Sequence, residues 1–218
     1  MRALVGERPV HLVGEDDQVA LEHDLTILSD EVYWALCYDR PHASILSIDG
    51  MPERTVLLDG WSKTFAMTGW RLGFGVFPDA LVEPVTRLVI NSVSCTSAFS
   101  QHAAIAGLTG PWEPVEEMRA EFRRRRDVIV EGLNKIAGVS CLSPDGAFYV
   151  FPNVLALGHP SKRIEEHLLE SAGVACLSGT AFGRSGEGYL RLSYANSVEN
   201  IQFALAAIDK ALPEIEGG

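Results

Sequence analysis

Short apolar runs that end in polar or turn-forming residues dominate the first half of the chain. Each run has the length of a strand, and together they predict strands at Leu25–Leu28, Thr55–Leu58 and Leu72–Phe77. Continuous apolar runs of this kind are typical of strands buried on both faces of an α/β sheet. Apolar residues at helical spacing predict the end of a helix at Val19–Asp24 and helices at Asp79–Asn91 and Ser100–Leu108.

The second half of the chain opens with its longest predicted helix, from about Trp112 to Ile136. Gly138 follows this helix as a stop signal. A turn at Pro144-Asp145-Gly146 separates two predicted strands, Cys141–Leu142 and Ala147–Phe151. The remaining pattern predicts helices at Ile164–Ser171 and Glu199–Leu212, and strands at Ala175–Leu177 and Tyr189–Ser193.

This order of elements predicts two parts. An α/β part covers residues 1–112, and a smaller α+β part, which includes the long helix, covers residues 113–218. The first 20 residues give a weak pattern, in which Ala3–Val5 and His11–Gly14 are either strand pieces or loop.

Composition narrows the function classes. The chain has 218 residues, is 47% hydrophobic and 22% charged, and carries a net charge of −11, which is ordinary for a globular protein and disfavours nucleic-acid binding. The four cysteines are single and the six histidines are isolated, so we expect no metal site. No apolar run is long enough for a membrane span and residues 1–10 do not resemble a secretory signal, so we expect a cytoplasmic protein.

The most informative stretch runs from Gly60 to Phe74 and contains Lys63 directly after a predicted strand. Ligands of α/β sheets bind at the carboxyl ends of strands, and burial lowers the pKa of a lysine as Schiff-base chemistry requires. Spacing alone also fits a surface lysine. The glycines Gly69, Gly73 and Gly75 do not form a GxGxxG motif and open no predicted helix, so a dinucleotide site is not supported.

Five segments in the same order resemble the class I and II pyridoxal-phosphate (PLP) aminotransferases of PLP fold type I. The stretch around Lys63 resembles the PLP-lysine signature, and Ser29–Tyr33 resembles the segment that meets the pyridine ring. Glu117–Asp127 resembles the interdomain helix, and the last two, Pro144–Tyr149 and Gly188–Ala195, resemble small-domain segments. The resemblance runs from about Val19 to Leu212. It implies a partial large PLP-binding domain with a mixed, mainly parallel sheet, plus a small α+β domain.

The resemblance also implies roles for the cofactor-binding residues. Lys63 is expected to hold PLP covalently and to move the substrate proton once the substrate has displaced it. Asp30 is expected to pair with the pyridine nitrogen, Tyr33 to contact the phenolic oxygen, and Arg71 to bind the phosphate. On residue type alone, Asp30 equally fits a loop cap and Tyr33 a half-buried aromatic.

Substrate binding is expected at Arg191, which lies between Leu190 and Leu192 on a predicted strand. In the family the arginine at this motif position binds the substrate α-carboxylate; from the pattern alone it also fits a surface arginine of a sheet. The implied substrates are an amino acid and a 2-oxo acid.

Two departures from the family pattern bear on activity. Gly60 stands where many relatives carry Ser or Thr beside the phosphate, and Ser62 is a candidate substitute. The chain also lacks a counterpart to the N-terminal half of the family, and residues 1–17 do not resemble it. Aminotransfer is the favoured function. A PLP-dependent carbon–sulfur lyase or related synthase, and a non-catalytic remnant, stay open, and we expect self-association, with a homodimer implied by the family.

Overall fold

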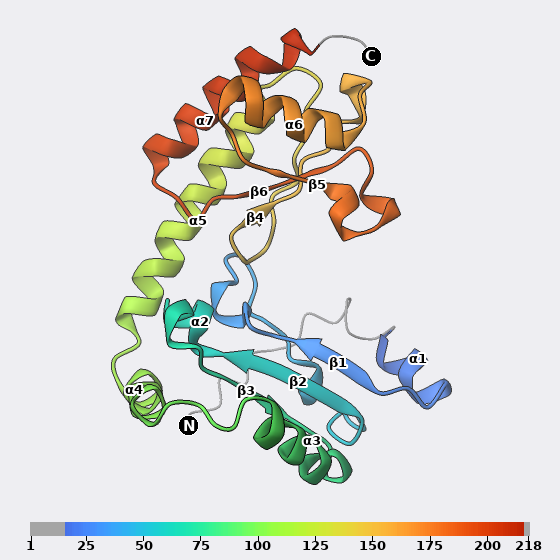
Figure 1. Ribbon diagram of the computed structural model, residues 1–218, viewed down its shortest axis with the longest axis vertical. Helices are drawn as coiled ribbons and strands as arrows, with labels where there is room; N and C mark the ends of the chain where they lie inside the picture. Colours follow the sequence, from blue (N-terminus) through green and yellow to red (C-terminus); the bar gives the residue numbers. More distant parts are fainter. Residues whose placement is uncertain (1–15, 216–218) are drawn as a thin grey trace. The chain divides into compact units, whose positions relative to one another are not determined.

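The computed structural model describes residues 16–215, which form two compact units (Figure 1). The first unit ends at Glu116 and the second begins at Glu117. Helix α5 (Glu113–Leu133) starts in the first unit and continues into the second. The segments Ala3–Val5 and His11–Gly14 lie outside the described residues.

The first unit is built on a three-stranded mixed sheet in the order β1-β2-β3, formed by β1 (Ile27–Asp30), β2 (Thr55–Gly60) and β3 (Gly73–Val76). Strand β1 is parallel to β2, and β3 is antiparallel to β2. All three predicted strands are therefore confirmed, each within a few residues of its expected bounds.

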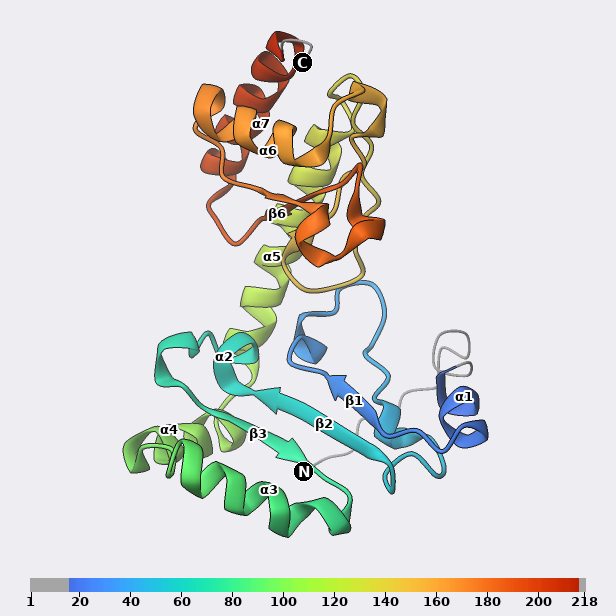
Figure 2. The same ribbon diagram turned by 45° about the vertical axis from the view of Figure 1, so that its right-hand side comes forward.

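Four α-helices among the described residues accompany this sheet, and α3 runs beside β3 in both views of the ribbon (Figure 2). They are α1 (Asp16–Glu22), α2 (Trp61–Thr64), α3 (Asp79–Ser92) and α4 (Ala98–Thr109). The helices predicted at the start of the unit, at Asp79–Asn91 and at Ser100–Leu108 are confirmed. Trp61 ties α2 to α4, because its Nε1 donates to the carbonyl oxygen of Ala104 at 3.2 Å.

Two expectations about the sheet were wrong for the described residues. The sheet has one parallel and one antiparallel pair, so it is mixed but not mainly parallel. Its strands are also not buried on both faces, since Leu28 is 69% exposed and Phe74 46% exposed. The edge of Trp61 packs against Phe74 at 5.5 Å between ring centroids and covers it only in part, and α3 contributes no buried residue.

The second unit is α+β, as predicted. Its antiparallel sheet has the order β4-β6-β5 and consists of β4 (Tyr149–Val150), β5 (Leu177–Ser178) and β6 (Leu190–Ser193). Helices α5, α6 (Ser161–Ala172) and α7 (Val198–Ala211) supply the apolar side chains that pack against it. The core of this unit includes fully buried Leu133, Ile164, Leu168 and Tyr194.

The predicted strand pair around Pro144-Asp145-Gly146 is largely wrong. Cys141–Leu142 forms no strand, and of Ala147–Phe151 only Tyr149 and Val150 do. These two residues pair with β6 instead of with Cys141–Leu142. The backbone there is held by side chains: Asn134 accepts from the backbone N–H of Cys141 at 2.8 Å and donates to its carbonyl oxygen at 2.9 Å.

Candidate active site

The carboxyl ends of β1 and β2 bring two of the predicted site residues to one edge of the sheet. Asp30 is the last residue of β1 and is in register with Leu58. Lys63 lies on α2, which begins directly after β2 ends at Gly60. Because the two strands are parallel neighbours, their ends meet at the edge where α/β sheets bind ligands. Asp30 is exposed, and its Oδ1 accepts the backbone N–H of Val32 at 3.2 Å.

Lys63 and Tyr33 lie close together at this edge. The Nζ atom of Lys63 is 5.7 Å from the centroid of the Tyr33 ring, within cation–π range. Both residues are half-buried. Tyr33 follows β1 after a short turn, so the strand ends that carry Asp30 and Lys63 also position this aromatic ring.

An aromatic cluster of Trp34, Phe65 and Trp112 packs within the same unit. The ring of Trp112 stacks on Trp34 at 5.8 Å between centroids and meets the edge of Phe65 at 5.7 Å. Trp34 also donates through Nε1 to Asp59 Oδ2 at 3.0 Å, just before α2. These contacts fix the segments on both sides of Lys63, since Asp59 precedes it and Phe65 follows it.

Arg71 lies in the left-handed backbone region, with φ of 54°, between η3 (Thr68–Trp70) and β3. Its guanidinium donates to the carbonyl oxygen of Thr68 at 2.7 Å and is exposed. Arg71 lines a groove of about 850 Å³ in the first unit together with Thr96, Ser97 and Ser100 at the start of α4. Hydroxyls, a guanidinium and a helix N-terminus all favour an anion.

Gly60 is explained by the close approach of β2 and β3. A Cβ atom at this position would meet the carbonyl oxygen of Leu72 at 2.9 Å and Cα of Gly73 at 3.0 Å. Both contacts are with backbone, so a Ser or Thr at position 60 would require the strands to separate. Ser62, the candidate substitute, lies on α2 next to Lys63 and is half-buried.

Sequence reasoning gave no role to the buried carboxylate of Glu31, next to Asp30. Glu31 is 8% exposed and accepts hydrogen bonds from His42 at 2.7 Å, from Ser44 Oγ at 3.0 Å and from the backbone N–H of Ile45 at 3.2 Å. Burial alone would raise the pKa of Glu31, but the hydrogen bonds from His42 and Ser44 outweigh it and leave the pKa lowered. Glu31 therefore fastens the loop that follows Tyr33 onto the end of β1.

Stability of the first unit is expected to fall at alkaline pH because of His42. Hydrogen bonds with Cys37 and Glu31 raise the pKa of His42 from 6.5 to about 9. A pKa that is higher in the folded state gives stability that is fully present below about 6.5 and is lost as the pH rises through about 9. Urea unfolding between pH 6 and 10 checks this; tryptophan fluorescence is the probe, since all four tryptophans lie in this unit.

The matched variants for this prediction are His42→Gln and His102→Gln. His42→Gln is expected to flatten the alkaline fall, whereas His102→Gln, at an exposed position of α4, keeps the wild-type profile. An equal alkaline fall in the wild type and in His42→Gln would contradict the assignment.

Asp59 is the other carboxylate near this edge that the sequence did not single out. Burial raises its pKa, hydrogen bonds from the backbone N–H of Gly60 and from Trp34 oppose the rise, and the charges of Glu31 and Asp30 add to it. The sequence signal was weak, because an Asp-Gly pair after a strand indicates a turn more often than a site.

Arg191 lies in the second unit, on β6, where it is in register with Leu177 of β5. Its Cζ atom is 4.7 Å from the ring centroid of Tyr149 and 4.8 Å from that of Phe182. The sequence pattern alone also fitted a surface arginine of a sheet, and the structure places Arg191 half-buried against these two aromatic rings. Arg191 belongs to the second unit and Lys63 to the first.

The residues at the edge of the first sheet suit PLP. A primary amine can hold an aldehyde, a carboxylate can pair with a protonated pyridine nitrogen, and a guanidinium can bind a phosphate; Lys63, Asp30 and Arg71 supply these groups. Thr64, next to Lys63, adds an orphaned polar atom: its hydroxyl is buried and has no hydrogen-bond partner among the residues described. No group of three or more residues suited to a metal ion occurs within residues 16–215.

Comparison with known proteins defines the class. The profile of the family "Aminotransferase class I and II" matches residues 17–208. An aromatic-amino-acid aminotransferase of Thermococcus litoralis is 46% identical over 89% of this chain and 51% of its own length, and an aspartate aminotransferase of Pyrococcus abyssi is 45% identical with the same coverage. The crystal structure of an aromatic aminotransferase from Pyrococcus horikoshii is 43% identical with a TM-score of 0.90, covering 93% of this chain and 54% of that one.

The chain therefore belongs to the class I and II aminotransferases, a family that depends on PLP. The resemblance seen in the sequence and the expected α/β fold of a partial large domain with an α+β part are confirmed. The chain spans about half the length of the curated relatives it matches. Nothing in these comparisons favours the lyase or the non-catalytic remnant. No described helix has the length and apolar character needed to cross a bilayer.

Proposed function

We propose that this chain contributes the lysine, the pyridine-nitrogen partner and the carboxylate-binding arginine of a PLP-dependent aminotransferase. The reaction moves an amino group between an amino acid and a 2-oxo acid. The observation that carries the proposal is the placement of Asp30 and Lys63 at the shared carboxyl edge of the parallel pair β1 and β2. Membership of the aminotransferase family supports the reaction type.

Each cofactor-binding residue has a distinct task in this proposal. PLP, when bound, supplies an electron sink for the electrons of the substrate Cα–H bond. Asp30 keeps the pyridine nitrogen protonated, Tyr33 donates a hydrogen bond to the phenolic oxygen, and Arg71 with Ser62 binds the phosphate. Lys63 holds the cofactor, and its freed amine then takes the proton from the substrate Cα as a general base.

Arg191 binds the substrate α-carboxylate through its guanidinium fork in this proposal. Residues 1–112 and 113–218 are proposed as the two domains, a partial large PLP-binding domain and a small C-terminal domain. A cytoplasmic location stays a prediction from the sequence.

The proposal is tested by titrating the purified chain with PLP, reducing with borohydride and mapping the labelled peptide. We expect a visible absorption band and a label on Lys63, because this lysine follows β2 at the strand edge that carries Asp30 and its Nζ lies 5.7 Å from the centroid of the Tyr33 ring. The absence of a band, or a label spread over Lys135, Lys162 and Lys210, would show that this chain by itself does not assemble the cofactor site.

We further propose that the chain associates with itself, and as a dimer by analogy with its family. Large apolar side chains of the first unit are exposed along its sheet and on α3, among them Leu28 at 69%, Leu88 at 68% and Ile90 at 57%. Exposed apolar surface on this scale favours association. Light scattering at micromolar concentration is expected to give at least twice the 23.7 kDa of one chain. A monomeric mass would exclude this proposal.

A further inference from the structure

The guanidinium of Arg191 lies against two aromatic rings that come from different segments of the second unit. Tyr149 belongs to β4, the neighbour of β6 in the sheet, and Phe182 ends η5 (Gly179–Phe182). The Cζ atom of Arg191 is 4.7 Å and 4.8 Å from their centroids. Both distances lie well inside the range of about 6 Å over which a cation is attracted to a ring face.

These contacts restrict Arg191 without using its hydrogen-bond donors. A ring face attracts the charge but accepts at most weak hydrogen bonds, so the N–H groups of the guanidinium stay available to a ligand. Arg191 is half-buried, so its charge is partly removed from water. A planar donor fork held in this way matches the two oxygens of a carboxylate.

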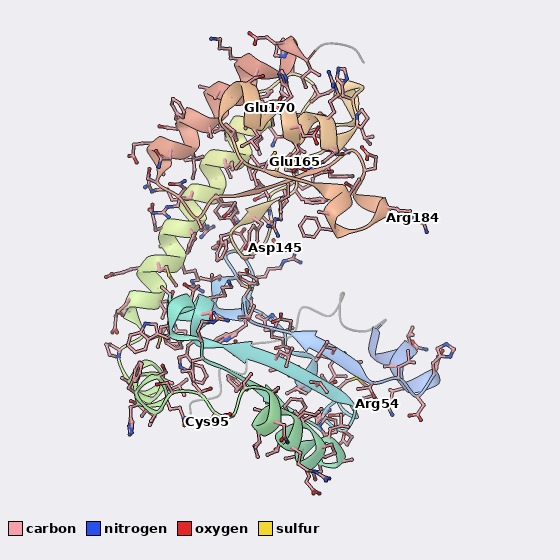
Figure 3. All side chains as sticks on the ribbon, in the orientation of Figure 1. Arg54, Cys95, Asp145, Glu165, Glu170 and Arg184 are labelled. Carbon is pink, nitrogen blue, oxygen red and sulfur yellow. The ribbon has the colours of Figure 1, made fainter. Side chains whose placement is uncertain are left out.

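Phe182 is not placed by burial in the core. It is 55% exposed, so the apolar driving force for its position is incomplete. The turn that carries it is instead held by backbone contacts: the N–H of Gly179 donates to the carbonyl oxygen of Tyr189 at 2.8 Å, and Ser178 Oγ caps Thr180. Phe151 meets the edge of Phe182 at 6.1 Å. The turn continues into η6 (Arg184–Gly186), where Arg184 projects away from the unit (Figure 3).

We propose that Phe182 and Tyr149 are positioning residues that hold Arg191 in the orientation in which its donor fork receives the substrate carboxylate. Phe182 is the decisive one, because its ring is 55% exposed and so contributes little to the core of the unit, whereas it lies 4.8 Å from the guanidinium of Arg191. This inference rests on the proposed function, in which Arg191 binds that carboxylate.

The kinetic test compares Phe182→Ala, Phe182→Leu and Phe182→Tyr in the full chain with PLP, using pyruvate as the 2-oxo acid. Phe182→Ala is expected to raise the KM for pyruvate by about 5- to 30-fold with kcat changed less than about 3-fold, because the cation–π contact orients the guanidinium that binds the carboxylate in the ground state. Phe182→Tyr should restore the wild-type KM, and Phe182→Leu should lie between. An unchanged KM in Phe182→Ala, or Leu as good as Tyr, would overturn the proposal.

A second readout does not depend on turnover. The nitrogen-15 Nε–Hε signal of Arg191, assigned by its loss in Arg191→Lys, is expected to carry a ring-current shift that moves in Phe182→Ala and Tyr149→Ala and returns in Phe182→Tyr. A signal that keeps its wild-type position in both Phe182→Ala and Tyr149→Ala would overturn the positioning role even in an active chain. The expected shifts in a chain without turnover would support positioning and reject the proposed function alone.

Discussion

Replacing Lys63 by alanine is expected to abolish the borohydride-fixed label and to lower aminotransfer by at least about 10³-fold. The amine of Lys63 is the only group at this edge of the sheet proposed both to hold the cofactor and to move the substrate proton. Positioned general acid–base catalysis alone contributes about 10²- to 10⁴-fold, and loss of the covalent attachment adds to this. The measurements are peptide mapping after reduction, and amino-group transfer to a 2-oxo acid.

Lys135→Ala is the matched control for this variant. Lys135 is exposed and pairs with Glu131 at 2.6 Å on the second unit, so its removal should leave labelling and transfer unchanged. Far-UV circular dichroism confirms that both variants fold. If Lys63→Ala keeps its label or more than a tenth of the wild-type rate, another group holds the cofactor and the assignment fails.

The fold was predictable where the local pattern and the final packing agree. The apolar runs before Asp30 and Asp59 became β1 and β2, and their ends gave the site edge because parallel neighbours align their carboxyl ends. Strand direction was not predictable, since nothing local to β3 distinguishes its antiparallel pairing with β2. The strand predicted at Cys141–Leu142 does not form because the side chain of Asn134 hydrogen-bonds to both backbone groups of Cys141. These two residues are seven positions apart, and the spacing of hydrophobic residues does not reveal their contact.

The site residues also divide into those that the sequence revealed and those whose contacts form only on folding. Lys63 and Arg71 belong to one continuous stretch whose residues resemble the PLP-lysine signature of the family, so the sequence alone singled them out. The network around Glu31 depends on His42 and Ser44, which approach only because the loop after Tyr33 folds back onto β1. Phe182 was hidden for the same reason: its contact with Arg191 spans a turn whose shape the sequence does not give.

Gly179→Ala is expected to destabilise the second unit by about 1–3 kcal/mol, the usual cost of forcing an extra methyl into a filled space. Gly179 and Gly186 face each other so closely that a Cβ atom on either one would overlap the other's backbone, and on Gly179 it would also lie 2.9 Å from the carbonyl oxygen of Tyr189. Backbone cannot rotate away as a side-chain tip can, so the turn that carries Phe182 must open. The urea midpoint followed by circular dichroism measures the loss of stability.

The turn around Gly179 also links this stability change to the site. If opening the turn releases Phe182, the Nε–Hε signal of Arg191 should move in Gly179→Ala as it does in Phe182→Ala. Gly69→Ala is the control, because its Cβ would have no atom within 4 Å and its φ is not in the left-handed region. We expect it to shift stability by no more than about 0.5 kcal/mol. If the urea midpoint of Gly179→Ala equals that of the wild type, the turn accommodates the methyl group without loss of stability. The turn then cannot be what holds Phe182 against Arg191.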